Sequence, residues 1–442
     1  MRREVDRLCD IILPGQVCKQ SLDFEAAEMA MRFSVHKVGA LFLEKLVNAD
    51  RGGHCGAQID CGSGHTAKFV GYRSKTVTTV LGDIKVQRAY YHSENLCKGY
   101  VPKDTQLDIE KTGFSPGVRR MMALVGAKES FDAGRDDLKI LAGVSVTDKD
   151  VERISENIGE SIEVISEQER REAVISNVSQ LLPAIEDLYI MMDGTGVPMV
   201  KKETKGRKGK DESCEAKTRE AKLGCLFTVT EMDKEGRPIR DKDTAVYTGQ
   251  IETSEDFGER IYAQALRSGL ARAKRVCVLG DGAAWIRNIV EDKFSKAIQI
   301  VDYYHATEHL GDLAKVVHAK NKPIRDLWLD TQCKELWEGD VAIVIEAMRR
   351  LEPDNETAKE LLRTTVQYFE TNEQRMQYAK FRAIGLFVGS GVIEAGCRTV
   401  VGQRLKLSGM RWTVRGANAI ISLRCCQLSG QWEDYWANRA AA

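Results

Sequence analysis

Two short apolar runs, each leading into an aspartate, are the strongest hydrophobic pattern in the chain. Residues 188–192 read LYIMM and lead into Asp193, and residues 276–279 read VCVL and lead through Gly280 into Asp281. Short apolar runs bounded by turn-forming residues are typical of buried β-strands. We therefore expect two buried strands that each deliver one carboxylate, with residues 194–198 breaking the first strand. The alternative for either strand alone is an ordinary Asp-Gly turn.

The apolar pattern around these runs predicts a mixed α/β domain. Further strands are expected at residues 223–230, 244–247 and 297–301, and helices at residues 257–273 and 285–290. Three strands in series, followed by helix, strand, helix and strand, describe a mixed sheet of ribonuclease H type. Residues 306–383 show only helical patterns, which predicts an all-helical insertion within a domain spanning residues 181–442.

The chain before this domain shows two other patterns of apolar residues. Apolar residues recur at helical spacing over residues 21–48, and Thr, Val and Tyr alternate over residues 75–91. The second pattern predicts a β-hairpin turning at Gly82-Asp83 and held by packing of Val77, Val80, Ile84, Val86 and Tyr90. Together these elements form a predicted first region, residues 1–110.

Residues 111–180 form a predicted helical region. A helix starts near Pro116, a second covers residues 133–141, Gly143 turns the chain, and Thr147 caps a third. This outline fits a helix-turn-helix that would place Lys149 and Arg153 near DNA. A plain helical connector fits the pattern equally well.

Composition narrows the class of protein. The 442 residues are 43% hydrophobic and 29% charged, with 65 basic and 65 acidic side chains. A formal net charge of zero excludes a wholly electrostatic, histone-like binder, although local basic patches can still bind nucleic acid. We expect no membrane span, because no apolar run reaches about 18 residues. The charged N-terminus lacks a signal-peptide core, and the 12 cysteines show no paired framework, so we expect a cytoplasmic protein with reduced thiols.

Cysteine and histidine residues flank the predicted hairpin. The candidates for a zinc ribbon are Cys55, Cys61, His65, His92 and Cys97. A ribbon needs two closely spaced pairs, whereas these pairs are separated by five and four residues. The alternative is a β-region with incidental cysteines.

Basic residues gather after the first aspartate and near the C-terminus. Residues 201–222 form a polar, basic loop, and residues 395–432 contain no Asp or Glu. Ahead of the second stretch, Ser390 is expected to cap a helix that carries Glu394 and Arg398 one turn apart. We expect phosphate contacts from both stretches, the alternatives being a solvated loop and a surface Glu394–Arg398 pair. The candidates are Lys201, Lys202, Lys205, Arg207, Lys208, Arg398, Arg404, Lys406, Arg411 and Arg415.

Six sequence blocks, taken together, resemble the ISKra-type transposases of bacterial insertion sequences. They are VGYRSKTVTTVLGDIKVQRAYYH (70–92), MMDGTGVPM (191–199), REAKLGCLFT (219–228), LGDGAAWI (279–286), IVDYYHATEHL (300–310) and GSGVIEAGCRTVVGQRLKLSGMRW (389–412). The resemblance implies a ribonuclease H-like DDE core in which Asp193, Asp281 and Glu394 are catalytic and bind metal. It also implies terminal inverted repeats and target DNA as partners, a homo-oligomer on DNA, and a place at the bacterial nucleoid. The family usually carries a cysteine pair directly after the tyrosines, where this chain has His92 and Ser93, so we expect no zinc.

The implied chemistry explains the residue types. Carboxylates are the ligands that Mg²⁺, or Mn²⁺, prefers, and two ions about 3.5–4 Å apart flank the scissile phosphate in such enzymes. Asp302, His305 and His309 are possible assisting residues, although a histidine at a helix start is more often structural. Two other functions stay open: a ribonuclease H-like nuclease or resolving enzyme that does not join strands, and a non-catalytic DNA-binding descendant.

Overall fold

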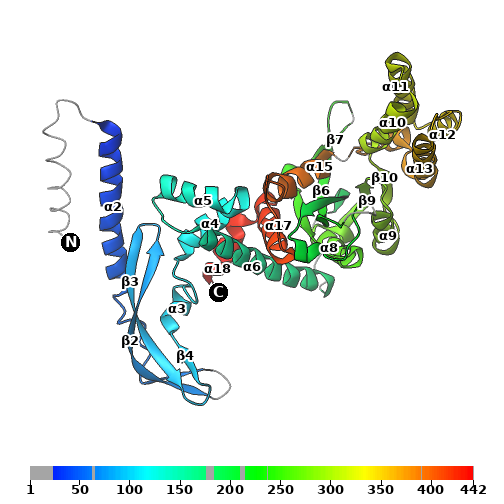
Figure 1. Ribbon diagram of the computed structural model, residues 1–442. Helices are drawn as coiled ribbons and strands as arrows, with labels where there is room; N and C mark the ends of the chain where they lie inside the picture. Colours follow the sequence, from blue (N-terminus) through cyan, green and yellow to red (C-terminus); the bar gives the residue numbers. More distant parts are fainter. Residues whose placement is uncertain are drawn as a thin grey trace. The chain divides into compact units, whose positions relative to one another are not determined.

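The computed structural model describes residues 23–61, 65–175, 184–209, 215–235, 237–389 and 391–441. It separates into two compact units, residues 1–155 and residues 156–442, which meet within helix α6 (Asp148–Ile175). Figure 1 shows the helices and strands of each unit. None of the helices in the described part of the chain has the length and apolar content that a bilayer-spanning segment needs.

The first unit contains a long helix and a four-stranded antiparallel sheet. Helix α2 (Phe24–Val47) confirms the predicted helix, and Asp23 caps it by accepting a hydrogen bond from the Ala26 amide at 3.1 Å. The sheet has the order β1-β2-β3-β4, and the strands are Gln58–Asp60, Thr66–Thr79, Gly82–Ser93 and Lys98–Tyr100. Strands β2 and β3 form the predicted hairpin and extend it at both ends.

The hairpin turn lies two residues earlier than the sequence predicted. Thr79 pairs with Gly82, so Val80 and Leu81 form the turn instead of Gly82-Asp83. The Thr79 hydroxyl explains the shift, because it donates to the Gly82 carbonyl at 2.7 Å and accepts from the Leu81 amide at 3.2 Å. Val77, Ile84 and Val86 are buried against Ala40 of α2, as the expected packing requires. Tyr90 is only half-buried, under the Arg73 guanidinium at 3.5 Å.

Helices α3 (Pro102–Gln106), α4 (Pro116–Lys128) and α5 (Phe131–Asp137) follow, and α5 continues into the π-helical segment Leu138–Ala142. Gly143 ends this segment in the left-handed conformation, at φ 69°, where a side chain would be strained. The predicted cap of α6 is confirmed, because the Thr147 hydroxyl accepts from the Asp150 amide at 3.1 Å.

The second unit is built on a mixed six-stranded sheet, which confirms the coarse prediction of a mixed α/β domain. Its order is β10-β9-β5-β6-β7, and β8 also pairs with β6. Strands β9 and β10 run parallel to β5, whereas β6 is antiparallel to β5, β7 and β8. The strands are β5 Ile185–Pro198, β6 Thr218–Met232, β7 Pro238–Arg240, β8 Val246–Gln250, β9 Ala273–Gly280 and β10 Ile298–Val301.

Helices α8 (Ser254–Arg267) and α9 (Ala284–Lys293) cover one face of this sheet. Their buried side chains pack on the inward residues of β5, β6 and β9 in one apolar core. Gly224 of β6 makes this contact possible, because a Cβ there would lie 2.2 Å from the Ile261 side chain. On the opposite face, Tyr189 stacks on Phe227 at 5.2 Å, and Phe387 meets Tyr189 edge-on at 5.2 Å.

The helical pattern predicted for residues 306–383 is confirmed, and the first helix begins slightly earlier, at Tyr303. The helices of the insertion are α10 Tyr303–Val317, α11 Lys322–Glu338, α12 Val341–Arg349, α13 Glu356–Asn372 and α14 Tyr378–Ala383. The chain enters and leaves the insertion side by side, because the Tyr303 amide donates to the Val388 carbonyl at 2.9 Å.

The C-terminal part returns to the second face of the sheet. Helix α15 (Gly391–Gly396) packs there through Gly396, where a Cβ would lie 2.8 Å from the Tyr247 ring. It continues into the π-helical segment Cys397–Gly402, followed by α16 (Gln403–Leu405), α17 (Val414–Leu428) and α18 (Trp432–Ala441). Ser390, the predicted cap of α15, lies outside the described residues.

Candidate active site

The register of two parallel strands places Asp193 and Asp281 next to each other. Met191 of β5 pairs with Leu279 of β9, and each aspartate follows two residues later on its own strand. Strand β9 ends at Gly280, whereas β5 continues to Pro198 by pairing with Thr218–Lys222 of β6. The prediction that Gly194 breaks the strand is therefore wrong, because the antiparallel partner supplies the missing backbone hydrogen bonds. Asp193 still marks the point where parallel pairing stops.

The Asp193 carboxylate is held by the two segments beside it. Its Oδ1 accepts a hydrogen bond from the Gly194 amide at 2.7 Å, and the Cys397 thiol donates a second hydrogen bond. Burial raises the pKa of Asp193, and the charge of Asp281 raises it further. The two hydrogen bonds and the charge of His305 oppose this rise without cancelling it. The two neighbouring carboxylates therefore repel each other, and a bound cation would relieve that repulsion.

Asp281 has a different set of contacts. Its Oδ1 accepts from the Ala283 amide at 2.8 Å, and its backbone carbonyl accepts from the Tyr368 hydroxyl at 2.8 Å. Tyr368 belongs to α13, so the helical insertion is anchored directly to the residue that carries the second carboxylate.

Glu394 lies on α15, one helical turn before Cys397, the residue that binds Asp193. Helix α15 packs on the second face of the sheet, so Glu394 lies on an element that covers this face. The Glu394 side chain is exposed. Among the described residues, no three His, Cys, Asp or Glu side chains are grouped closely enough to hold a metal ion. The donor chemistry of Asp193 and Asp281 fits a hard divalent cation, because both side chains offer carboxylate oxygens.

Asp302 is a helix cap in this structure. Its backbone amide donates to the Gly280 carbonyl at 2.9 Å, which continues the parallel register from β9 to β10. The side chain is fully buried, and its Oδ1 accepts from the amides of Tyr304 at 2.5 Å and His305 at 3.0 Å. Asp302 therefore fixes the start of α10 and the position of His305.

The two predicted histidines sit one turn apart on α10. The rings of His305 and His309 are 4.9 Å apart, and the His309 ring lies 4.3 Å from Tyr368. Burial lowers the pKa of His309, and the charge of His305 lowers it further. His309 is thus a packed, neutral side chain, whereas half-exposed His305 acts electrostatically on Asp193.

Sequence reasoning missed Cys397 and Tyr368. Cys397 carried a usable signal, because it follows Glu394 by three residues within a predicted helix. Tyr368 carried none, because its contact with Asp281 joins residues 87 positions apart.

The structure brings the two basic stretches together at the extended end of β5. The Trp412 amide donates to the Pro198 carbonyl at 3.0 Å, and the Val200 amide donates to the Trp412 carbonyl at 2.9 Å. Lys406 adds a hydrogen bond from its Nζ to the Thr195 hydroxyl at 2.6 Å. Helix α7 (Lys201–Thr204) follows directly. The exposed basic side chains of this region are Lys201, Lys202, Lys205, Arg207, Lys208, Arg398, Lys406 and Arg411.

Two of the residues predicted to contact DNA have other contacts in the structure. Arg404 is fully buried, with its Nη1 3.0 Å from the Met410 sulfur and its guanidinium 5.0 Å from the Trp412 ring, so it supports the fold instead of offering a charge to DNA. Arg415 remains at the surface but forms an ion pair with Glu160 of α6.

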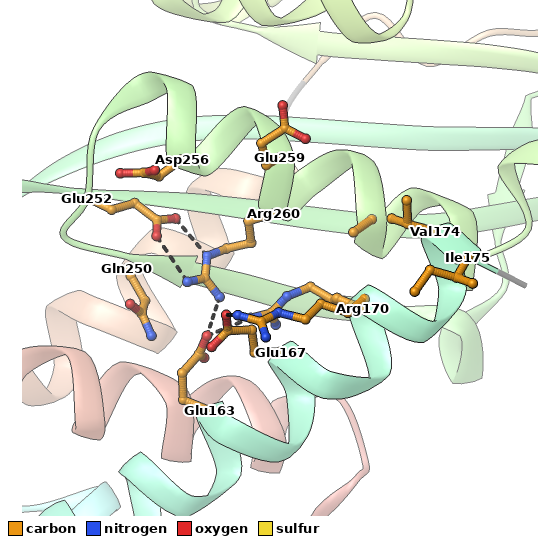
Figure 2. A pocket seen from close by; sticks show the side chains of 12 residues that line it. Glu163, Glu167, Arg170, Val174, Ile175, Gln250, Glu252, Asp256, Glu259 and Arg260 are labelled. Carbon is orange, nitrogen blue, oxygen red and sulfur yellow. Dashed lines mark hydrogen bonds and ion pairs between the residues drawn. The ribbon is translucent and has the colours of Figure 1, made fainter.

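A cavity of about 620 Å³ lies elsewhere, between α6 and α8. Figure 2 shows Arg260 between Glu252 and Glu163, with Arg170 reaching Glu163 from α6. The Arg260 Nε is 2.6 Å from Glu252, its Nη1 is 2.7 Å from Glu163, and Arg170 is 2.6 Å from Glu163. These charged groups satisfy one another, so the lining has a structural role.

Comparisons with known proteins identify a family whose description names no activity. The model of an "Uncharacterised protein family (UPF0236)" matches residues 65–437. A protein of Streptococcus gallolyticus described as "UPF0236 protein in vanSb 3'region" is 24% identical over 375 residues, covering 83% of this chain and 75% of that protein.

Proposed function

The chain belongs to the protein family UPF0236, and we propose that it is a divalent-metal-dependent enzyme that cleaves and joins DNA strands, a transposase of the DDE type. The observation that supports this most strongly is the parallel register that sets Asp193 beside Asp281 at one edge of a mixed sheet. Each aspartate also accepts a backbone amide hydrogen bond within its own turn, but turn formation alone does not require the two charges to lie side by side, where each destabilises the other.

The strand arrangement supports a ribonuclease H-like core. Strand β6 pairs antiparallel with β5, β7 and β8, and β9 and β10 then add in parallel at the other edge of β5 through α8 and α9. The helical insertion separates this core from α15, which carries Glu394. The order of Asp193, Asp281, insertion and Glu394 is the one that the resemblance to ISKra-type transposases implies.

Asp193, Asp281 and Glu394 would hold two Mg²⁺ or Mn²⁺ ions. Ions bound there make a water molecule or a DNA 3′-hydroxyl a stronger nucleophile and stabilise the leaving oxygen. The protein's own groups prepare this site: Gly194 and Cys397 orient Asp193, Ala283 orients Asp281, and Asp302 positions His305 beside the carboxylates.

DNA would pass over the extended end of β5. The exposed lysines of α7 and the segment around Trp412 lie at the end of β5 beyond Asp193, and Lys406 binds Thr195 between them, which suits contacts to phosphates along the DNA backbone. The terminal inverted repeats of an insertion sequence and a target duplex are the proposed partners, and a homo-oligomer would hold two ends. The helices α4 to α6 keep the predicted helix-turn-helix role as part of this proposal. We place the protein in the bacterial cytoplasm, with the nucleoid.

The test is a cleavage and joining assay on supercoiled plasmid carrying the element's ends. With Mg²⁺ or Mn²⁺ the wild type should nick the ends and join them to target DNA, and Asp193→Asn, Asp281→Asn and Glu394→Gln should each lose both activities. The matched control is Glu186→Gln, an exposed carboxylate on the same strand β5, paired with Lys274, which should retain full activity.

Each alternative function has its own outcome. Cleavage without joining would favour a nuclease or resolving enzyme, and end binding without cleavage would favour a non-catalytic descendant. Wild-type rates in any one of the three variants would remove that residue from the site.

A further inference from the structure

The turn that carries Asp281 is held by a residue of the helical insertion. The Tyr368 hydroxyl of α13 donates to the Asp281 carbonyl at 2.8 Å. Gly282 follows with φ 86°, a conformation that residues with side chains rarely adopt. A Cβ at Gly282 would lie 2.9 Å from the Tyr368 ring, so the glycine leaves the space through which the tyrosine reaches the carbonyl.

This contact acts on the Asp281 side chain through the backbone. The Tyr368 hydroxyl binds the carbonyl of the peptide that joins Asp281 to Gly282. Gly282 then turns the chain so that the Ala283 amide points back and donates to Asp281 Oδ1 at 2.8 Å. The direction of the carboxylate and the position of the Tyr368 hydroxyl are therefore linked through one short turn, residues 281–283.

Tyr368 is held by side chains of two helices. The His309 ring of α10 lies 4.3 Å from the Tyr368 ring, and the Asn372 side-chain amide of α13 donates to the Tyr368 carbonyl at 2.9 Å. Burial raises the pKa of Tyr368, and the charge of Asp281 raises it further. The hydroxyl therefore keeps its proton and serves as a hydrogen-bond donor to the turn.

The insertion has no overall positive charge that would attract DNA. Residues 303–383 contain 12 basic and 14 acidic side chains. Exposed cations on α12 and α13 form ion pairs, Arg349 with Glu370 and Arg363 with Glu360. Surfaces that bind DNA carry an excess of Lys and Arg. The contact with Asp281 thus connects the insertion to the proposed reaction more closely than its charge does.

We propose that Tyr368 is a positioning residue for Asp281, which makes the helical insertion part of the proposed active site. This inference rests on the proposed function, because it gives the insertion a task in holding one of the metal-binding carboxylates. The hydroxyl keeps the turn at residues 281–283 in one conformation, so that the carboxylate is already directed when a cation arrives. Loss of a group that orients a metal ligand typically weakens metal binding about 10–100-fold.

Mn²⁺ binding to the full chain without DNA tests this role apart from activity, with the free ion measured by electron paramagnetic resonance. Tyr368→Phe removes only the hydroxyl and should weaken Mn²⁺ binding about 10–100-fold. The matched control is Tyr378→Phe, at a buried tyrosine of α14 whose hydroxyl has no hydrogen-bond partner within the described part of the chain. It should bind Mn²⁺ as the wild type does, and both variants should melt within a few degrees of the wild type.

Cleavage of the supercoiled plasmid gives a second measurement. Tyr368→Phe should need about 10–100-fold more Mg²⁺ for half-maximal cleavage and should approach the wild-type rate at saturating Mg²⁺, with unchanged DNA affinity. Mn²⁺ affinity and Mg²⁺ requirement that both equal the wild-type values would overturn the positioning role, and so would equal losses in the two Phe variants. A wild type that neither binds Mn²⁺ nor cleaves DNA would overturn the proposed function and this inference with it.

Discussion

The surroundings of the Asp193 carboxyl group disfavour its ionised form. Burial and the nearby Asp281 raise its pKa above the ordinary value of 3.8. The folded protein therefore binds a proton more tightly than the unfolded chain does, and stability falls as the pH rises from the ordinary pKa through the raised one. Near neutral pH the full penalty is present.

Asp193→Asn should therefore melt a few degrees higher than the wild type at pH 7 while losing strand cleavage. The difference in melting temperature should shrink as the pH falls through the raised pKa and then below 3.8, where the wild-type carboxyl is protonated in both states. Thermal unfolding measured across this pH range checks the expectation, with Glu186→Gln as the control. An unchanged or lower melting temperature at pH 7 would contradict a strained carboxylate pair.

Cys397 holds the Asp193 carboxylate, which gives it a positioning role in the proposed reaction. Cys397→Ala removes the thiol that donates to the carboxylate, whereas Cys397→Ser keeps a donor at the same place. Loss of a partner that orients a metal ligand typically weakens metal binding about 10–100-fold, so the Ala variant should need more Mg²⁺ for half-maximal cleavage. Titrations of cleavage against Mg²⁺ should place the Ser variant near the wild type. Equal shifts in both variants would assign Cys397 to packing alone.

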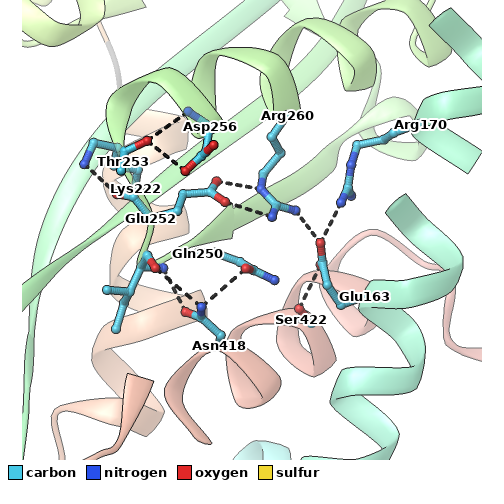
Figure 3. A network of polar contacts seen from close by, with 11 residues as sticks. Glu163, Arg170, Lys222, Gln250, Glu252, Thr253, Asp256, Arg260, Asn418 and Ser422 are labelled. Carbon is cyan, nitrogen blue, oxygen red and sulfur yellow. Dashed lines mark hydrogen bonds and ion pairs between the residues drawn. The ribbon is translucent and has the colours of Figure 1, made fainter. Parts of the chain in front are cut away.

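At the scale of elements, α6 is tied to the sheet by a buried charge network. Figure 3 shows Glu163 of α6 contacted by Arg170, by Arg260 of α8 and by Ser422 of α17. Burial acts to raise the pKa of Glu163, but the charges of Arg260 and Arg170 outweigh it and lower the pKa. The network therefore stabilises the fold above the ordinary pKa of 4.5, and this contribution is lost as the pH falls through the lowered one.

Glu163→Gln should cost about 3–5 kcal/mol of unfolding free energy at pH 7, because the buried Arg170 guanidinium loses its carboxylate partner and Arg260 keeps only Glu252. Denaturant unfolding measures this cost. Glu167→Gln, one turn along the same helix, breaks only the exposed pair with Arg171 and should cost about 0.3–0.5 kcal/mol. Similar costs for both variants would show that the network does not hold α6.

The hairpin of the first unit should be stabilised by side-chain packing and should not require zinc. Cys55 and Cys97 are exposed, and His54 packs edge-on against Phe69 at 4.7 Å. Metal analysis of protein purified without chelator should find no stoichiometric zinc, and chelator should leave the melting temperature unchanged. Ile84→Ala should cost about 2–5 kcal/mol, because it empties a buried position. One zinc per chain, lost in Cys61→Ser, would overturn this expectation.

At the scale of the whole molecule, a formal net charge of zero conceals a local basic surface around the end of β5. DNA binding should weaken steeply between about 50 and about 200 mM salt, because each neutralised phosphate releases a counterion. The double variant Lys201→Gln/Lys202→Gln should reduce the salt slope by about two. Lys274→Gln/Lys296→Gln, at the opposite ends of the parallel strands, should leave the slope unchanged. Affinity that does not respond to salt would exclude this surface.

Sequence patterns located the elements well and their contacts poorly. Apolar periodicity is a local signal, so α2, the hairpin, the strands and the helical insertion could be read from it. The turn at Val80-Leu81 could not, because a threonine hydroxyl decided it. The continuation of β5 past Gly194 depended on β6, and the burial of Arg404 depended on Trp412. The Asp193–Asp281 pair could be predicted, because both aspartates follow a similar apolar run and precede a glycine. The hydrogen bond from Tyr368 to Asp281 could be seen only in the folded structure.

The hydrogen bond between Tyr303 and Val388 has a topological consequence. The residues that enter and leave the helical insertion are neighbours. The insertion is therefore a closed loop, and it does not set the register of the strands. We therefore expect that its length can change without altering the register of strands β5 and β9. Tyr368 of the insertion contacts the core directly, so a shortened insertion that lacks α13 would leave the Asp281 carbonyl without that donor.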